Sequence, residues 1–197
     1  MNVTIINRDM KSLLKVLACV SIVLLFFKTC IYQKMTYMNE SEQQWATNRN
    51  IGEIMVLKSE NGDMASAVIN DVKTYNSLNP INLNYNFREE NLAMLRVGYT
   101  VFEKSDSLQG WVVVRKKNND GSLEVSAALG NRVTIGSLSL DKISSADGDC
   151  LYFNSKNTEI DKYDKCPNPV ASFVWSKSQG LMEFTLHDGT VYKRVDK

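Results

Sequence analysis

The chain has 197 residues, 44% of them hydrophobic, and 23 basic residues stand against 22 acidic ones. This length fits one domain of ordinary size with a small appendage, and the hydrophobic content is that of a globular protein with a packed core. The balanced charge excludes the basic surplus with which nucleic-acid binders displace counterions, so we expect no nucleic-acid partner. It also excludes a disordered acidic tail.

The N-terminal part of the sequence is strongly apolar from Leu13 to Tyr32, apart from Lys15 and Lys28. Its uninterrupted run, 16–27, has the length of a signal-peptide core. Both lysines lie near the ends, where a long side chain reaches the lipid headgroups and extends the span to about twenty residues. No small-residue cleavage pattern follows. We therefore expect an uncleaved membrane anchor in contact with lipid, with a cleaved signal peptide as the alternative.

The cysteines and the basic residues indicate a compartment. Slightly more basic residues precede the apolar segment than follow it closely, which favours a cytoplasmic N-terminus by the positive-inside rule. Cys150 and Cys166 are the only cysteines beyond that segment. Since an even pair in an exported domain is typical of a disulfide, we predict a Cys150–Cys166 bond in a periplasmic domain. Unpaired thiols in a cytosolic domain are the alternative.

The segments between residues 33 and 87 are mixed in character. Polar residues over 33–50 predict a juxtamembrane stalk, or a wet continuation of the membrane helix. A short apolar run over 51–57 is a candidate first strand. Between residues 65 and 75 the spacing of Ala65, Val68, Ile69 and Val72 predicts a short amphipathic helix.

From residue 92 onward the sequence is strand-like, with short β-branched and aromatic segments between turn signals. The Asp-Gly pairs at Asp120 and Asp188 predict two hairpins. The expected strands lie within 95–102, 110–115, 123–129, 133–140, 173–175, 182–186 and 190–192. The predicted fold class is mainly β (α+β): an N-terminal transmembrane helix and an antiparallel β-barrel or sandwich-like domain with one short helix.

The expected organisation follows from these segments. It is a short cytoplasmic tail over 1–12, a transmembrane anchor over 13–32, a stalk over 33–50 and a periplasmic β-rich domain over 51–197. The chain would then be a single-pass protein of a bacterial inner membrane.

No group of residues in the sequence has the pattern of a catalytic or metal site. His187, the one histidine, stands in a turn signal, where a solvated residue is expected rather than the base of a triad. Asp147-Gly148-Asp149 resembles a fragment of a calcium loop but lacks the other ligands. Two cysteines and one distant histidine cannot fill a zinc shell. We expect no enzymatic activity, no cofactor and no metal.

Two families share short features with this chain. Ser12-Leu13-Leu14-Lys15-Val16-Leu17 resembles the opening of a type IV pilin or pseudopilin helix, and the later cysteine pair is similar to that family's disulfide loop. The ending from Thr185 to Val191 resembles the final hairpin of the bitopic periplasmic partners of membrane-bound bacterial transcription regulators. That family has a similar layout of short tail, single span and β-barrel-like periplasmic domain.

These observations favour a non-enzymatic envelope protein that acts by periplasmic protein–protein contact, such as an accessory partner of a membrane-bound regulator. The alternatives are a minor pilin-like or secretion-system subunit and an envelope-located inhibitor or immunity protein. Tyr37 and Trp45 are the candidate exposed contacts with a partner, because aromatic residues are enriched at binding hot spots; the alternative is that both lie at the membrane interface.

Overall fold

The computed structural model describes residues 13–23, 36–76, 93–104, 106–116, 121–161 and 168–195. They belong to two compact units, one of which contains residues 13–23 and the other all the strands. Residues 13–23 form a helix whose side chains are exposed. Among the described residues, no helix is both long and apolar enough to cross a membrane. The predicted span, 13–32, continues into residues 24–32, which lie outside the described residues.

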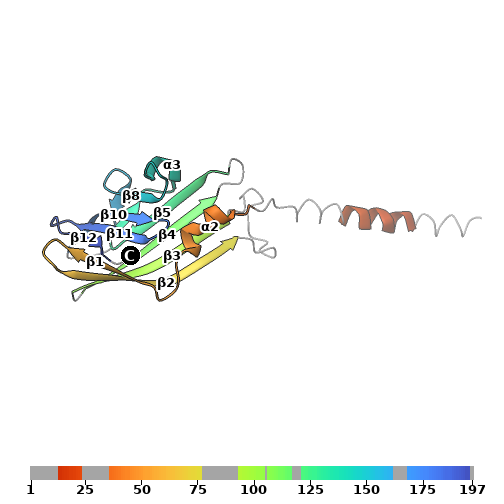
Figure 1. The fold of residues 1–197 in the computed structure, drawn as a ribbon. Helices are drawn as coiled ribbons and strands as arrows, with labels where there is room; N and C mark the ends of the chain where they lie inside the picture. The colour runs from red at the N-terminus through yellow and green to blue at the C-terminus, as the bar shows by residue number, and fades with distance from the viewer. Residues whose placement is uncertain are drawn as a thin grey trace, which may run out of the picture. The chain divides into compact units, whose positions relative to one another are not determined.

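The second unit is built of antiparallel strands with short helices (Figure 1). Its helices, within the described ranges, are α2 (Glu40–Thr47) and α3 (Leu140–Ile143). The strands are β1 (Ile54–Ser59), β2 (Met64–Asn76), β3 (Ala93–Glu103), β4 (Asp106–Lys116), β5 (Leu123–Leu129), β6 (Arg132–Thr134), β7 (Leu138–Ser139), β8 (Cys150–Phe153), β9 (Thr158–Ile160), β10 (Val170–Ser176), β11 (Gly180–Leu186) and β12 (Val191–Arg194). The expectation of a mainly β domain is confirmed.

The strands form a nearly closed barrel. They follow one path, β8-β10-β11-β12-β1-β2-β3-β4-β5-β6-β9, with β7 paired to β5 beside it. The chain itself joins the two ends of this path. β8 pairs with β10, and after a tight turn at Asn154, whose carbonyl accepts the amides of Asn157 and Thr158, β9 pairs with β6. Of the two predicted architectures, barrel and sandwich, the structure is the barrel.

We call the junction between the two ends of the strand path, β8–β10 and β6–β9, the seam. Side chains of β6 and of the residue before it strengthen this seam. The Arg132 side chain is buried, and its Nε donates to the Val170 carbonyl at 2.6 Å while Nη1 donates to Thr158 Oγ1 at 3.0 Å. The Asn131 side-chain oxygen accepts the Val170 amide at 3.3 Å. Burial lowers the pKa of the Arg132 guanidinium. These bonds join the start of β10 to β6 and to the residue before it, between two strands that are not neighbours in the strand path.

Aromatic side chains fill the barrel. Three pairs stack with ring centroids 5.0, 4.6 and 4.8 Å apart, a separation typical of favourable aromatic contacts. The six residues are fully buried: Tyr99 with Trp175, Phe153 with Phe173, and Phe184 with Tyr192. Packing of these rings therefore forms a large part of the hydrophobic core of the domain.

One glycine makes room for this packing. Gly110 on β4 is paired with Tyr99 on β3, and a Cβ at Gly110 would collide with Cε2 and Cζ of the Tyr99 ring. We expect Gly110→Ala to destabilise the fold by roughly 1–3 kcal/mol, the usual cost of overpacking a filled core. The ring would be pushed from its stack on Trp175 and from its hydrogen bond to the Ala128 carbonyl. Denaturant unfolding of the full chain in detergent would measure the loss.

Gly98→Ala is the matched control for that change. Gly98 lies on β3, and its Cβ would meet Asn70 Oδ1 at 2.9 Å and Asp71 Cβ at 3.1 Å, contacts less close than the 2.4 Å between a Cβ at Gly110 and the Tyr99 ring. The loss should be clearly smaller than at Gly110. Equal losses at the two sites would show that the Tyr99 ring does not depend on the glycine opposite it.

The predicted helix over 65–75 is wrong, because this stretch is the long strand β2. Ile69 pairs with Tyr99 and Asp71 with Gly98, so Asn70 is an extra residue, a β-bulge. A bulge shifts the inward-facing positions by one. Ala65, Ala67 and Ile69 face inward before it, and Val72 packs against the core after it. Positions 65, 69 and 72 therefore have the spacing of a helical face although the backbone is extended.

The two predicted hairpins are present. β4 pairs with β5, and β11 with β12, each in antiparallel register. His187 and Asp188 are exposed in the second turn. Asp120 of the first turn lies outside the described residues. The β-branched and aromatic residues on either side of the Asp-Gly turn signals were enough to locate these strands.

Candidate functional site

The candidate site lies beside α2, in the stretch where the sequence predicts a stalk. Asn39 caps this helix: its side chain accepts the Glu42 amide at 2.8 Å, and the Glu42 carboxylate accepts the Asn39 amide at 2.8 Å. This reciprocal capping box satisfies two amides that a helix start leaves unpaired. The Asn-x-x-Glu spacing is visible in the sequence, so the helix start could have been found there. Residues 36–50 belong to the β-rich unit rather than standing apart from it.

The helix is fixed to the barrel by buried and charged contacts. Trp45 and Ala46 are part of the hydrophobic core. Glu42 accepts from Lys116 Nζ at 2.9 Å, and both side chains are largely shielded from water. Lys177, from the β10–β11 turn, lies 5.9 Å from the centre of the Trp45 ring, within the range of a cation–π contact. α2 is thus held against several strands and forms a rigid wall for what lies next to it.

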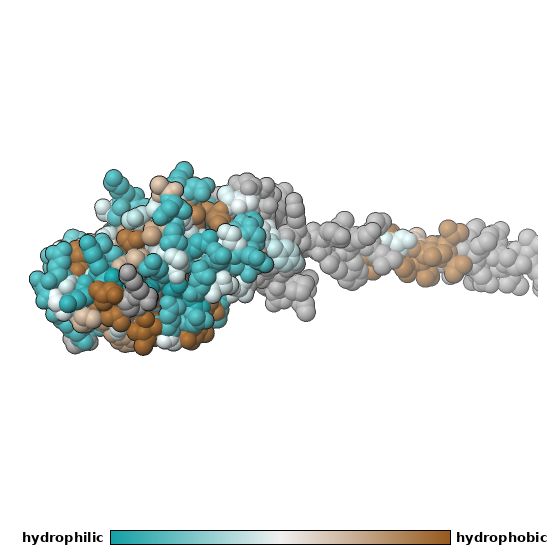
Figure 2. All heavy atoms as spheres, in the orientation of Figure 1, coloured by the Kyte–Doolittle hydropathy of each residue, from teal (hydrophilic) through white to brown (hydrophobic). Residues whose placement is uncertain are grey.

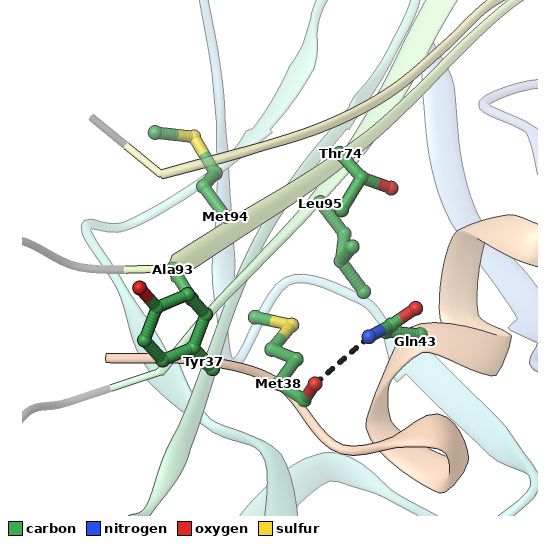
Figure 3. A pocket seen from close by; sticks show the side chains of 7 residues that line it. All are labelled: Tyr37, Met38, Gln43, Thr74, Ala93, Met94 and Leu95. Atoms are coloured by element: carbon green, nitrogen blue, oxygen red, sulfur yellow. Dashed lines mark hydrogen bonds between the residues drawn. The ribbon is translucent and has the colours of Figure 1, made fainter. Parts of the chain in front are cut away.

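A pocket of about 330 Å³ opens next to this helix, against β2 and β3 (Figure 3). The Gln43 side chain points across it and donates to the Met38 carbonyl at 2.8 Å, which holds the segment before the helix in place. The lining residues come from the segment before α2, from α2, and from the ends of β2 and β3: Tyr37, Met38, Gln43, Thr74, Ala93, Met94 and Leu95.

The chemistry of this lining is that of a contact site. Its apolar part comprises two methionines, whose flexible side chains adapt to different partners, together with Ala93 and Leu95. Its polar groups are the hydroxyls of Tyr37 and Thr74 and the amide of Gln43. Hydroxyls and amides give hydrogen bonds and direction rather than charge. The lining suits an uncharged, mainly apolar group.

The structure separates the two predicted contact residues. Tyr37 is 64% exposed and lines the pocket, as a contact residue should. The expectation that Trp45 is exposed is wrong: it is 3% exposed because the amphipathic helix turns it into the core. Met38, Gln43 and Met94, which sequence reasoning missed, stand beside Tyr37 instead. No local pattern marks Met94, since it reaches the site through pairing of β3 with its neighbours.

The predicted disulfide is not tested by the described residues. Cys150 is half-buried at the start of β8 and carries a free thiol. Burial, and then the nearby charges of Asp149 and Asp147, raise the pKa of this thiol. Cys166 lies outside the described residues, within 162–167.

The Asp147-Gly148-Asp149 segment forms a polar turn. The Asp147 carboxylate accepts from the Ser145 hydroxyl and from the Asp149 amide, and these bonds lower the pKa of Asp147. Asp149 accepts from the hydroxyls of Ser176 and Ser178 at 2.7 and 2.9 Å. Both carboxylates are therefore engaged in joining this turn to itself and to the β10–β11 turn.

The outer face of β1, β2 and β3 is a second candidate contact surface, because it carries exposed apolar side chains. Ile54 pairs with Val68, and Ser66 lies between Val56 and Phe102 in the same register. Figure 2 shows hydrophobic side chains gathered over β1 and β2 among hydrophilic ones. The most exposed large apolar residues of this face are Ile54, Met64 and Phe102. Contiguous apolar side chains on the outside of a sheet are typical of interaction surfaces.

A shallower groove of about 490 Å³ lies over β8, β10, β11 and β12. Its apolar lining includes Tyr152, Val174 and Met182, and its charged lining includes Glu183 and Lys193, which lie 3.8 Å apart.

No family model, curated protein or solved structure matches this chain.

Proposed function

We propose that this chain is a non-enzymatic, single-pass protein of a bacterial inner membrane whose β-barrel domain acts by contact with another membrane or periplasmic protein. The observation that carries the proposal is the pocket of Tyr37, Met38 and Met94 on a rigid wall made by α2. An accessory partner of a membrane-bound regulator is the form of this function that the layout favours.

The position of the pocket in the chain supports a partner close to the membrane. The predicted span ends at Tyr32, and the pocket begins at Tyr37, five residues later in the sequence. Under the anchor prediction, we expect the partner to contact this pocket through the segment that leaves the same membrane.

The lining supports an apolar side chain of that partner as the group that enters. Two methionines accept aliphatic and aromatic side chains alike, and the hydroxyls and the amide at the margin can bond to a partner's main chain. A lipid headgroup would need a charged group to recognise its phosphate, and the lining residues carry hydroxyl, amide and apolar groups. We therefore favour a protein over a lipid at this site.

Photo-crosslinking in cells tests the proposal. A photoreactive amino acid at position 37 should give an adduct with one defined membrane protein, identified by mass spectrometry. The matched control is position 152, because Tyr152 is also well exposed, at 47%, but lies on β8 away from the α2 pocket in the sheet order. The same adduct from both positions, or lipid adducts alone from position 37, would count against the proposal.

A second change makes the test specific to the pocket. Met94→Asp places a charge in the apolar lining while the Met94 side chain is only half-buried, so the barrel should remain folded. We expect the adduct from position 37 to fall at least tenfold, as the entering apolar group would have to desolvate the carboxylate. An undiminished adduct in a folded Met94→Asp protein would place the contact elsewhere.

A further inference from the structure

The β2 strand is longer than its neighbour β1, so part of one edge of β2 has no described strand beside it (Figure 1). The ladder between the two strands ends at Val68. One residue further on, Ile69 donates to the Glu53 carbonyl at 2.9 Å and accepts the Gly52 amide at 2.8 Å. Beyond Ile69, β2 continues alongside β3 only, within the described part of the chain. We call this stretch, 72–76, the open edge of β2.

The main chain of Val72 and Thr74 points toward the open edge. Antiparallel partners alternate between pairs that exchange hydrogen bonds and pairs that do not. Ile69 turns its main chain to the β1 side, so the next pair with β3, Asp71 with Gly98 after the bulge, is a bonded one. Val72 and then Thr74 therefore turn their N–H and C=O groups away from β3. No described residue bonds to these groups.

The pocket beside α2 lies on the inward side of this edge. Thr74 pairs with Leu95, and both residues line the pocket (Figure 3). A row of main-chain donors and acceptors at every second residue is complemented by another extended chain. Because the side chains of a strand alternate between the two faces of a sheet, a strand added to the open edge would present the side chain opposite Thr74 to the pocket.

The outward side of the same edge carries a surplus of positive charge. Lys73 and Arg96 share one carboxylate, that of Asp71, at 3.1 and 3.6 Å. The Lys73 side chain is 62% exposed. Opposite charges on neighbouring strands stabilise the pairing, and like charges directly opposite each other destabilise it. We therefore expect an acidic side chain on the added strand beside Lys73.

A second copy of this chain would not fill the pocket. In an antiparallel pair of two open edges, the second copy would bring positions 72, 74 and 76 to the pocket side. The one apolar residue among them, Val72, packs against the core of its own barrel. No large apolar side chain would then be available for a pocket of about 330 Å³. The occupant that fits is a segment of another protein.

We infer that the partner adds a strand to the open edge of β2, through an extended segment with an apolar side chain turned into the pocket and an acidic side chain beside Lys73. The inference rests on the proposed function, because it names the form in which the partner binds at the same pocket. Main-chain pairing gives the contact its strength, and the pocket and Lys73 select the side chains.

The adduct formed in cells from position 37 tests the pairing when Thr74 is replaced. Thr74→Pro removes the N–H at the open edge and places the proline ring in the path of an added strand. The ladder with β3 stays intact, since that N–H points away from it, and proline is tolerated at such an edge. We expect the adduct to fall at least tenfold. Thr74→Val, the matched control, loses only the hydroxyl and should keep the adduct.

The outcomes separate the inference from the proposed function. Absence of an adduct from the parent chain would overturn the proposed function itself. An undiminished adduct from a Thr74→Pro protein that melts cooperatively would overturn only the strand pairing, and so would an equal loss in Thr74→Val. An adduct with a second copy of this chain would overturn the choice of partner.

Amide hydrogen exchange gives a second measurement on the unaltered chain. In protein purified together with the partner that crosslinking identifies, the amides of Val72 and Thr74 should exchange at least tenfold more slowly than in the chain alone. Equal exchange in the two samples would rule out pairing at the open edge.

A charge reversal tests the acidic side chain of the partner. Lys73→Glu should reduce the adduct from position 37 severalfold, whereas Lys58→Glu, at an exposed lysine of β1, should leave it unchanged. Equal adducts from the two variants would show that no acidic residue of the partner lies beside Lys73.

Discussion

Replacing Trp45 by alanine should destabilise the β-barrel domain by roughly 3–5 kcal/mol, the range for removing a buried tryptophan from a packed core. The side chain is 3% exposed and lies in the same hydrophobic core as the strands. Its loss would leave a cavity under α2 and remove the contact with Lys177. Since α2 is the wall of the pocket, binding through Tyr37 should weaken as well. Denaturant unfolding followed by tryptophan fluorescence and circular dichroism would measure the loss.

Tyr37→Ala is the matched control, because Tyr37 belongs to the same segment but is 64% exposed. Its effect on stability should stay within about 0.5 kcal/mol, as for most surface substitutions. The two variants thus separate fold from contact: Trp45→Ala should impair both, Tyr37→Ala only the contact. A Trp45→Ala protein as stable as the parent would mean that α2 is not part of the folded domain.

Replacing Arg132 by methionine should destabilise the barrel by roughly 3–6 kcal/mol, because a bond from a charged donor to a buried acceptor contributes about 1.5–3 kcal/mol and two are lost. Methionine keeps much of the apolar stem, so the change tests the guanidinium. The Val170 carbonyl and the Thr158 hydroxyl would lose the donors that Arg132 gives them. Amide hydrogen exchange should increase first in β9 and β10, on the two sides of the seam.

Arg115→Met is the control for the loss of an arginine from this sheet. Arg115 is half-buried on β4, and its Nη1 donates to Ser137 Oγ at 3.4 Å near the surface. This variant should lose less than about 1 kcal/mol. Exchange in β9 and β10 that remains slow in Arg132→Met would show that the main-chain turn at Asn154 closes the barrel without help from this side chain.

The parts of the fold that could be predicted from the sequence are those fixed by near neighbours. β4 and β5 follow each other in the sequence with an Asp-Gly turn signal between them, and they pair with each other, so one hairpin contains the information that defines it. The bulge at Asn70 in β2 depends on the register with β3, which no short window contains. The contact of Arg132 with Val170 joins residues 38 positions apart, and a local pattern cannot predict it.

The same distinction applies to the candidate site. Tyr37 could be proposed from its residue type and its position after the apolar segment, and it does lie in the pocket. Trp45 has the same residue type, but whether it is exposed depends on how the capped helix packs on the strands. The Asn39–Glu42 capping box marks the helix start in the sequence, whereas Met94 and Thr74 reach the pocket only through the pairing of β2 with β3.

The compartment is inferred from two features, the cysteine pair and the N-terminal segment. An even pair of cysteines argues for an exported domain only if the two form a bond. Because Cys166 lies outside the described residues, the periplasmic assignment depends chiefly on the N-terminal apolar segment and its flanking basic residues. The anchor is thus the part of the proposal on which both location and partner depend.

The intact mass of the membrane-fractionated protein tests that part most directly. The proposal of a partner close to the membrane requires that the chain keep its apolar segment. We predict a mass that includes residues 13–32, in protein that stays in the membrane after washing with high salt and alkali. A mature chain that begins beyond Tyr32 and is released by the washes would contradict the account.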